Sequence, residues 1–321
     1  MNEVQFFEVT ADYAGQRLDN FLLARLKGVP KSLIYRVIRK GEVRVNKGRA
    51  KPERKLEAGE IVRVPPMRTR EVELVAPSQG LVNTLSDAVL YDDNGLIIIN
   101  KPSGLAVHGG SGINIGMIET LRQAYNASYL ELVHRLDRDT SGCVMVARKR
   151  SMLKYLQEGL RNKGVIQKRY LALVEGHWPK TLSVVNVPLK RCEYPNGERI
   201  VRVSDDGKES ETHFKVVQYF DGCTLVIAKP LTGRTHQIRV HAQHSGHALV
   251  GDEKYASSDF NKAMRSKGFK RLFLHAYNLG LSLPDEAVLN VSAPLPYDLM
   301  RPLEVMGLDT RNLEGLDVSH F

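Results

Sequence analysis

Cysteine is scarce in this 321-residue sequence, and long apolar runs are absent from it. The three cysteines, Cys143, Cys192 and Cys223, are widely spaced and form no C-x-x-C pair, which supports neither a disulfide framework nor a zinc ribbon. No apolar run approaches the roughly 18 residues that a membrane-spanning helix needs. The first residues also lack the basic and apolar segments of an export signal. We therefore expect a cytoplasmic protein with no membrane partner.

Signatures of nucleotide and metal sites are missing as well. Residues 100–112 (NKPSGLAVHGGSG) are rich in glycine, but no G-x-x-x-x-G-K-[ST] loop occurs and no G-x-G-x-x-G motif opens a helix. The histidines His236, His241, His244 and His247 lie close together, yet they include no H-E-x-x-H motif and fall on more than one helical face. The sequence therefore predicts no cofactor and no metal.

Positive charge is abundant and unevenly distributed. The formal net charge is +10, and residues 1–70 hold 16 basic but only 8 acidic side chains. Ten basic residues lie between Lys31 and Lys55, against only Glu42 and Glu53. A solvated basic face would explain a small excess, whereas this density favours a polyanionic partner.

The basic segment has the pattern of a small domain. Apolar residues repeat with helical spacing over 15–27 and again over 32–40, where we expect Ser32 as the N-cap and Gly41 as the stop. Alternating residues beyond this helix predict two strands around an N-K-G turn. The basic side chains of the second helix and the turn are Arg36, Arg39, Lys40, Arg44, Lys47 and Arg49.

Strands outnumber helices in the rest of the chain and do not alternate strictly with them. This pattern predicts an α+β fold with a mixed, largely antiparallel sheet flanked by helices. Residues 130–136 (LELVHRL) are among the expected strands. We expect a first domain over 1–75, a linker over 76–85, a second domain over 86–306 and a tail over 307–321.

The segment H-R-L-D-R-D-T-S-G, residues 134–142, is the first candidate for chemistry. Asp137 lies between Arg135 and Arg138, and nearby cations favour the ionised carboxylate, which acts as a nucleophile or a base. A salt-bridged turn is the alternative for such a loop.

Two further segments carry candidate residues. In T-G-R-T-H-Q-I-R-V-H, residues 232–241, the start of a helix and the cation of Arg234 suit a phosphate, although a capped surface helix is the alternative. The segment Q-K-R-Y places Tyr170 at a strand edge, where its ring could stack on a base or serve as an ordinary strand aromatic.

Together these segments resemble one family. H-R-L-D-R-D-T-S-G, Q-K-R-Y-L-A-L-V, G-R-T-H-Q-I-R-V-H and R-L-F-L-H-A resemble, in this order, the motifs of RluA-type RNA pseudouridine synthases. Residues 15–66 resemble an S-four-type (αL) RNA-binding domain, and the whole resemblance spans roughly residues 12–300. The stretches KGVPKSLIYRVIRKGEVRVN, GGSGINIGMIE and LELVHRLDRDTSG are most similar to members that modify large-subunit (23S) ribosomal RNA.

The resemblance implies a reaction and roles for particular residues. A small αL domain would precede a catalytic domain that isomerises a flipped-out uridine to pseudouridine. Asp137 would be the catalytic aspartate, which either attacks the sugar or abstracts a proton. Arg239 would pair with Asp137, and Tyr170 would stack on the uracil. The isomerisation loses no group, so it needs no cofactor.

The resemblance also implies how RNA is bound. Arg135 would fill the space left by the flipped base, and Arg138, Arg234 and Lys101 would contact the RNA. The partner would be large-subunit ribosomal RNA or a ribosome assembly intermediate, bound by a monomer whose basic first domain supplies affinity. The loop that ends at Ala256 departs from the family pattern there, and we expect this loop to lie outside the catalytic core.

Three alternatives stay open at this point. The same chemistry could act on another structured RNA, such as transfer RNA. The same surfaces could bind RNA without catalysis, although a pure binder needs no carboxylate facing RNA. The histidine-rich helix could hold zinc in a hydrolase, although the sequence lacks the H-E-x-x-H motif of such sites.

Overall fold

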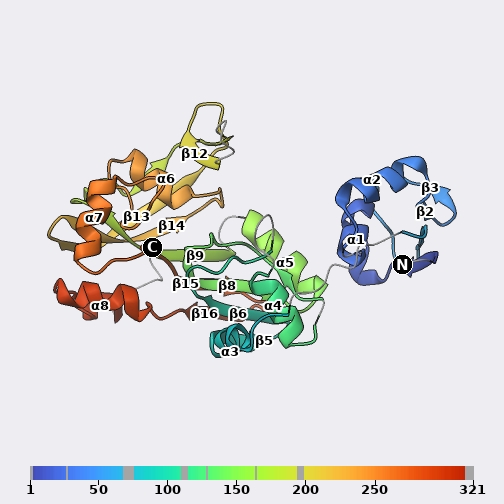
Figure 1. The fold of residues 1–321 in the computed structure, drawn as a ribbon, viewed down its shortest axis with the longest axis horizontal. Coiled ribbons are helices and arrows are strands. Elements are labelled where there is room, and N and C mark those ends of the chain that lie inside the picture. The colour runs from blue at the N-terminus through green and yellow to red at the C-terminus, as the bar shows by residue number, and fades with distance from the viewer. Residues whose placement is uncertain are drawn as a thin grey trace. The chain divides into compact units, whose positions relative to one another are not determined.

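The chain folds into two compact units, Met1–Ala76 and Pro77–Phe321, which we call the N-terminal and C-terminal units. The computed structural model describes residues 3–26, 28–67, 76–109, 115–127, 129–162, 165–193 and 199–314 (Figure 1). Residues 110–114 of the glycine-rich segment lie outside the described residues.

The N-terminal unit packs two helices against a small antiparallel sheet. Its elements are β1 (Gln5–Glu8), the 3-10 helix η1 (Ala11–Tyr13), α1 (Leu18–Arg25), α2 (Lys31–Lys40), β2 (Arg44–Val45), β3 (Gly48–Arg49) and β4 (Ile61–Val64). The strand order is β1–β4–β2–β3. Leu22 of α1, Ile34 of α2 and Val62 of β4 share one core. The two expected helices are confirmed, whereas β1 was not expected.

Helix α2 begins slightly earlier than the sequence predicts. It starts at Lys31, and its N-cap is Pro30 and not Ser32. Pro30 has the extended backbone that precedes a helix, with a ψ of 137°, and this places Ser32 inside the first turn. Gly41 ends the helix as expected, because its φ of 71° is a left-handed conformation that glycine adopts without strain.

The C-terminal unit is built on one large sheet. Its elements are α3 (Gln79–Asp87), β5 (Val89–Asp93), β6 (Leu96–Lys101), α4 (Met117–Ala124), β7 (Glu131–Leu132), β8 (Ser141–Ala147), α5 (Arg150–Arg161), β9 (Ile166–Glu175), β10 (Val184–Asn186), β11 (Leu189–Glu193), β12 (Arg199–Val203), β13 (Glu211–Phe220), β14 (Cys223–Pro230), α6 (Gln237–His244), α7 (Ser258–Ser266), β15 (Leu274–Ser282), β16 (Val288–Ser292), α8 (Tyr297–Val305) and α9 (Arg311–Glu314). Its strands run in the order β10–β13–β14–β9–β15–β8–β6–β5, while β16 pairs with β15, β7 pairs with β8, and β11 and β12 form a separate hairpin.

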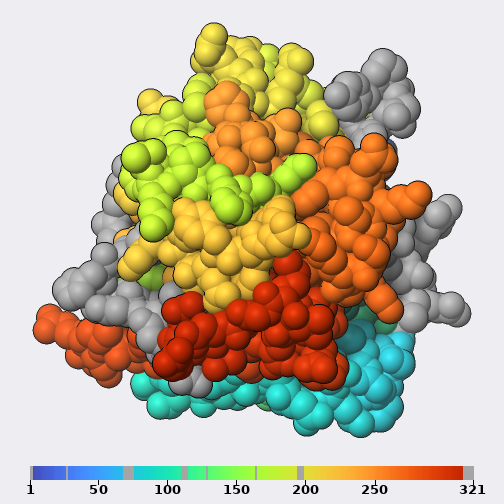
Figure 2. Space-filling model, turned by 90° about the vertical axis from the view of Figure 1, so that its left-hand side faces the viewer, coloured from blue at the N-terminus to red at the C-terminus, as the bar shows by residue number. Residues whose placement is uncertain are grey.

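The sheet is mixed and largely antiparallel, as expected. Among the ladders that the structure describes, β8 and β15 alone run parallel. Side chains of each strand alternate between the two faces: in β6, Ile97 and Ile99 pack in one cluster with α4 and α6, whereas Leu96 and Ile98 pack with α5 on the other face. Helices α7 and α8 cover more of that second face, and Figure 2 shows their orange and red surfaces side by side.

Three segments of this unit differ from the expectation. Residues 76–85, expected as a linker, belong largely to α3, whose Leu85 is buried in the core. The strand expected over 130–136 pairs only at Glu131–Leu132, because the chain then leaves the sheet as a loop. The described part of the expected tail includes α9, which packs Leu313 against the core.

A close backbone contact anchors the loop of residues 133–140. Gly142 follows this loop with a φ of 107°, and a Cβ atom there would lie 2.3 Å from the carbonyl oxygen of Ala276 in the parallel strand β15. Glycine is therefore required for the two strands to approach each other. Elsewhere, none of the helices in the described residues is long and apolar enough to cross a membrane.

Candidate active site

An open cleft in the C-terminal unit brings together four distant parts of the sequence. Its cavity volume is about 120 Å³. The loop before β8, strand β9, the segment from the end of β14 into helix α6, and the start of β15 line it. Of the residues predicted from the sequence, the cleft contains Arg135, Asp137, Tyr170, Arg234 and Arg239.

Arg239 lies between two carboxylates. Its Nη1 atom is 3.5 Å from Oδ2 of Asp137, as the pairing predicts, but its shorter contacts are with Asp252. Its Nε and Nη2 atoms donate to the two oxygens of Asp252 at 2.6 and 2.7 Å. Burial lowers the pKa of Arg239, but the hydrogen bonds with Asp252 and the charges of Asp252 and Asp137 together raise it, so the cation is retained beside Asp137.

Asp252 corrects the expectation that its loop lies outside the catalytic core. The Asp252 side chain is completely buried, whereas that of Asp137 is 23% exposed. Gly251 forms the turn before it, with a φ of 73° and no room for a Cβ beside the carbonyl of Arg271. No pattern in the sequence links Asp252 to Arg239, which lies thirteen residues earlier. Asp252 was therefore not predicted as a site residue.

His236 faces Asp137 from a second side. Its Nε2 atom lies 3.7 Å from Oδ2 of Asp137, and its Nδ1 atom lies 2.7 Å from the hydroxyl of Tyr255. That hydroxyl accepts the backbone N–H of Val201, which leaves its own hydrogen to donate to Nδ1. The proton of a neutral His236 then resides on Nε2 and points towards Asp137. Burial, and then the charge of Arg239, lower the pKa of His236 and favour this neutral form.

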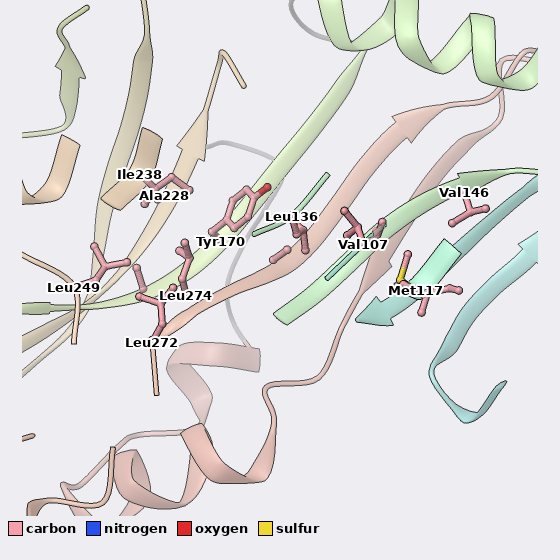
Figure 3. Packing of buried hydrophobic residues seen from close by; sticks show 14 of the residues in the cluster. Val107, Met117, Leu136, Val146, Tyr170, Ala228, Ile238, Leu249, Leu272 and Leu274 are labelled. Atoms are coloured by element: carbon pink, nitrogen blue, oxygen red, sulfur yellow. The ribbon is translucent and has the colours of Figure 1, made fainter. Parts of the chain in front are cut away.

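Tyr170 forms an apolar wall of the cleft. It projects from β9 and is only 8% exposed, packed with Leu136 and Ile238 (Figure 3). Within the described residues its hydroxyl forms no hydrogen bond, so the hydroxyl is available to a bound molecule. Burial, reinforced by the charge of Asp137, raises the pKa of Tyr170 and keeps it protonated.

Lys101 is not a surface contact, which corrects the expectation that it binds RNA. The residue is fully buried, and its Nζ atom donates to the carbonyl oxygens of Pro102, Leu105 and Arg138 at 2.8–2.9 Å. Three carbonyl acceptors match the three N–H bonds of an ammonium group. Burial nevertheless lowers the pKa of Lys101 to about 7. Its role in the structure is to hold the loop that carries Asp137.

The other predicted RNA contacts lie at the surface. Arg135 is exposed at the cleft, whereas Arg138 pairs with Asp139 at 3.0 Å. The backbone N–H of Arg234 donates to the side chain of Gln237, so this amide is not free for a phosphate. In the N-terminal unit, Arg44 is half-buried and the remaining predicted residues are exposed: Arg36, Arg39, Lys40, Lys47 and Arg49.

The histidines of the zinc alternative serve separate contacts. His241 forms a hydrogen bond with Ser210 within the core, and Nδ1 of His247 donates to the carbonyl oxygen of Glu175. In the part of the chain that the structure describes, no three His, Cys, Asp or Glu side chains are grouped so as to hold a metal ion.

Comparison with known proteins identifies the family. Residues 95–244 match the family model of RNA pseudouridylate synthase, and residues 16–62 match that of the S4 domain. A ribosomal large subunit pseudouridine synthase C of Pasteurella multocida is 53% identical over 304 residues, which cover 94% of this chain and 93% of the relative. The chain belongs to the RNA pseudouridylate synthase family. It is therefore an RNA pseudouridine synthase, as the motifs predict.

Other relatives agree with this assignment. The synthase of the same name from Escherichia coli strain K12 is 53% identical over 307 residues, covering 94% of this chain and 96% of that protein. Among solved structures, human RNA Pseudouridylate Synthase Domain Containing 4 superposes with a TM-score of 0.58 at 28% identity. That match covers 72% of this chain and 97% of the human chain. The predicted α+β architecture, with an RNA-binding domain before a catalytic domain, is confirmed.

Proposed function

We propose that this pseudouridine synthase modifies uridines in large-subunit ribosomal RNA, with Asp137 as its catalytic residue. The names of relatives 53% identical to this chain support that choice of RNA. The observation that carries the catalytic assignment is the meeting of Asp137, Arg239 and Tyr170 in one cleft. A buried guanidinium holds the carboxylate beside it in place and stabilises negative charge there, which suits chemistry at the sugar.

The reaction is an isomerisation within one nucleotide. The bond between C1′ of the ribose and N1 of the uracil breaks, and a bond between C1′ and C5 forms. A proton leaves C5 and a proton is taken up at N1, so the composition of the nucleotide is unchanged. Asp137 acts at the ribose, Arg239 and the N–H of His236 stabilise its negative charge, and the ring of Tyr170 supports the uracil.

Binding the target requires the base to leave the RNA stack. Arg135, exposed at the cleft, occupies the vacated space, and the nearby cations of Arg138 and Arg234 contact the backbone. The S4 domain supplies affinity that depends on salt and little on sequence, through its exposed basic side chains. The protein works as a monomer on the RNA or on an assembling subunit.

Mapping pseudouridine in cells tests the proposed substrate. Large-subunit ribosomal RNA would be mapped in cells without the protein and in cells restored with wild type, Asp137→Asn or Asp139→Asn. Asp139 is the matched control, because it is a neighbouring carboxylate that pairs with Arg138. We expect sites that disappear, return with wild type and Asp139→Asn, and stay absent with Asp137→Asn. Sites lost from transfer RNA alone would contradict the proposed substrate, and sites restored by Asp137→Asn would contradict the catalytic assignment.

A further inference from the structure

One cross-strand row spans the whole sheet of the N-terminal unit. Phe6 of β1 lies opposite Arg63 of β4, Arg63 lies opposite Arg44 of β2, and Arg44 lies opposite Arg49 of β3. Residues directly opposite each other in antiparallel strands project from the same face. We call these four residues the outer row, because Val62 and Val45 next to them alternate into the core.

The outer row begins with a phenylalanine that the core does not use. Phe7, the next residue, contacts the ring of Phe21 in the core, with the ring centroids 6.4 Å apart. Phe6 is instead 65% exposed, and Ile61 on the same face is 49% exposed. An exposed aromatic ring on an edge strand invites association, so its presence there points to a binding partner.

The charges beside Phe6 indicate the chemistry of that partner. Arg63, Arg44 and Arg49 form no ion pair with any described residue; Arg63 donates to the carbonyl oxygen of Glu42. Neighbouring strands are about 4.8 Å apart, so the three arginines leave adjacent strands on one face, where the side chain of Arg49 lies against Gly41. Glu8, opposite Ile61, is the acidic side chain of β1 on this face. A protein partner with an apolar surface would desolvate these cations, whereas RNA would neutralise them.

We propose that the outer row binds an unpaired segment of RNA, with a base stacked on Phe6 and phosphates along Arg63, Arg44 and Arg49. Aromatic rings beside a basic groove are the general means of holding single strands, since every base has a face to stack. The inference rests on the proposed RNA substrate and adds a surface to it. The helix α2 and the β2–β3 turn remain free to contact paired RNA at the same time.

Binding of full-length protein to two RNA probes tests this inference. The probes are a labelled single-stranded oligouridylate and a fully paired RNA stem, both at low salt. Phe6→Ala is expected to weaken binding of the oligouridylate by about five- to one-hundred-fold and to leave the paired stem nearly unchanged. Phe6→Leu is expected to lose almost as much, because a leucine side chain offers no flat ring. Tyr297→Ala is the matched control, since Tyr297 is an aromatic residue of the C-terminal unit that is 78% exposed.

The salt dependence of oligouridylate binding separates the stacking contribution of Phe6 from the charge contribution of Arg63. Arg63→Gln is expected to reduce the slope of log K against log salt by about 0.7, the value for one phosphate of a single strand, whereas Phe6→Ala leaves the slope unchanged. Unchanged oligouridylate affinity in Phe6→Ala, full retention in Phe6→Leu, or an equal loss on the paired stem would each overturn the inference. Such results would leave the proposed function intact, because rRNA modification by the wild type is measured separately.

Discussion

The cations on helix α2 of the N-terminal unit and the cations around the cleft of the C-terminal unit are used in opposite ways. On α2 of the N-terminal unit, Arg36 and Lys40 are exposed and hold no buried partner. In the C-terminal unit, Arg239 is bidentate with buried Asp252, and Lys101 donates to three carbonyl groups. Exposed cations attract RNA in many orientations, whereas Arg239 and Lys101 are fixed in position and orient the carboxylate of Asp137 or its loop. Substitutions in the first group should therefore change affinity, and those in the second should change stability and turnover.

The largest effect is expected from Asp252→Asn. This substitution removes one partner of a buried ion pair, which costs about 3–5 kcal/mol, and it releases Arg239 from its position beside Asp137. Urea unfolding of the C-terminal unit measures the loss, and single-turnover assays should show a lower rate with unchanged RNA affinity. Glu253→Gln is the control, because Glu253 is exposed and pairs with Arg265 at the surface. If Asp252→Asn had the same free energy of unfolding as the wild type, the role of the Arg239–Asp252 pair would be contradicted.

The second-largest effect is expected from Lys101→Met. It leaves buried carbonyl groups without donors, and we expect a loss of about 3 kcal/mol in the free energy of unfolding. Turnover should fall because the loop carrying Asp137 loses its anchor. The salt dependence of RNA binding should not change, since Lys101 is buried away from RNA. A reduced salt slope would show instead that this lysine contacts phosphate, and the distinction between the two units would fail.

A smaller effect with a defined pH dependence is expected from Tyr255→Phe. The hydroxyl of Tyr255 stabilises neutral His236, so its removal should raise the pKa of His236. Activity is lost as pH falls through this pKa, because an imidazolium competes for the charge of Asp137. The acid limb of the rate profile should therefore move to higher pH, with about a fivefold loss near neutrality. Tyr129→Phe, at an exposed tyrosine, should leave the profile unmoved. An unmoved profile in Tyr255→Phe would contradict the assigned hydrogen bond.

The smallest effect is expected from Arg36→Gln on α2. Arg36 is exposed, so stability should change by less than about 0.5 kcal/mol. If Arg36 contacts a phosphate of paired RNA, the slope of log K against log salt should fall by about 0.9. Titrations at several salt concentrations measure this change. A fall in turnover on saturating RNA would mean that the N-terminal unit also affects the chemistry.

Local patterns predicted much of this fold. Strands β6, β8 and β9 are buried on both faces and read as apolar runs, whereas α2 and α5 bury one face and show helical spacing. A sequence displays both patterns directly. The pair Asn94-Gly95 is a typical signal for the tight turn between β5 and β6, and both residues have positive φ. Elements with weaker patterns, such as α3 and α7, were missed because tertiary packing, and not periodicity, decides them.

Site residues that lie in sequence motifs could be predicted. Residues that only orient another site residue could not. Asp137, Tyr170 and Arg239 were expected in one site, and the structure brings them into one cleft. Asp252 and Tyr255 were missed because their contacts depend on the turn at Gly251. Lys101 was misplaced because lysine is usually exposed, and only the folded loop supplies three acceptors for a buried amine.

The most direct measurement is the single-turnover rate of pseudouridine formation in large-subunit ribosomal RNA with saturating protein. Wild type, Asp137→Asn and Asp139→Asn would be compared at equal RNA occupancy. The proposed mechanism predicts that Asp137→Asn lowers the rate by about a thousandfold or more, while Asp139→Asn stays near wild type. An Asp137→Asn protein that binds RNA and forms pseudouridine at the wild-type rate would contradict the central claim that this carboxylate performs the chemistry.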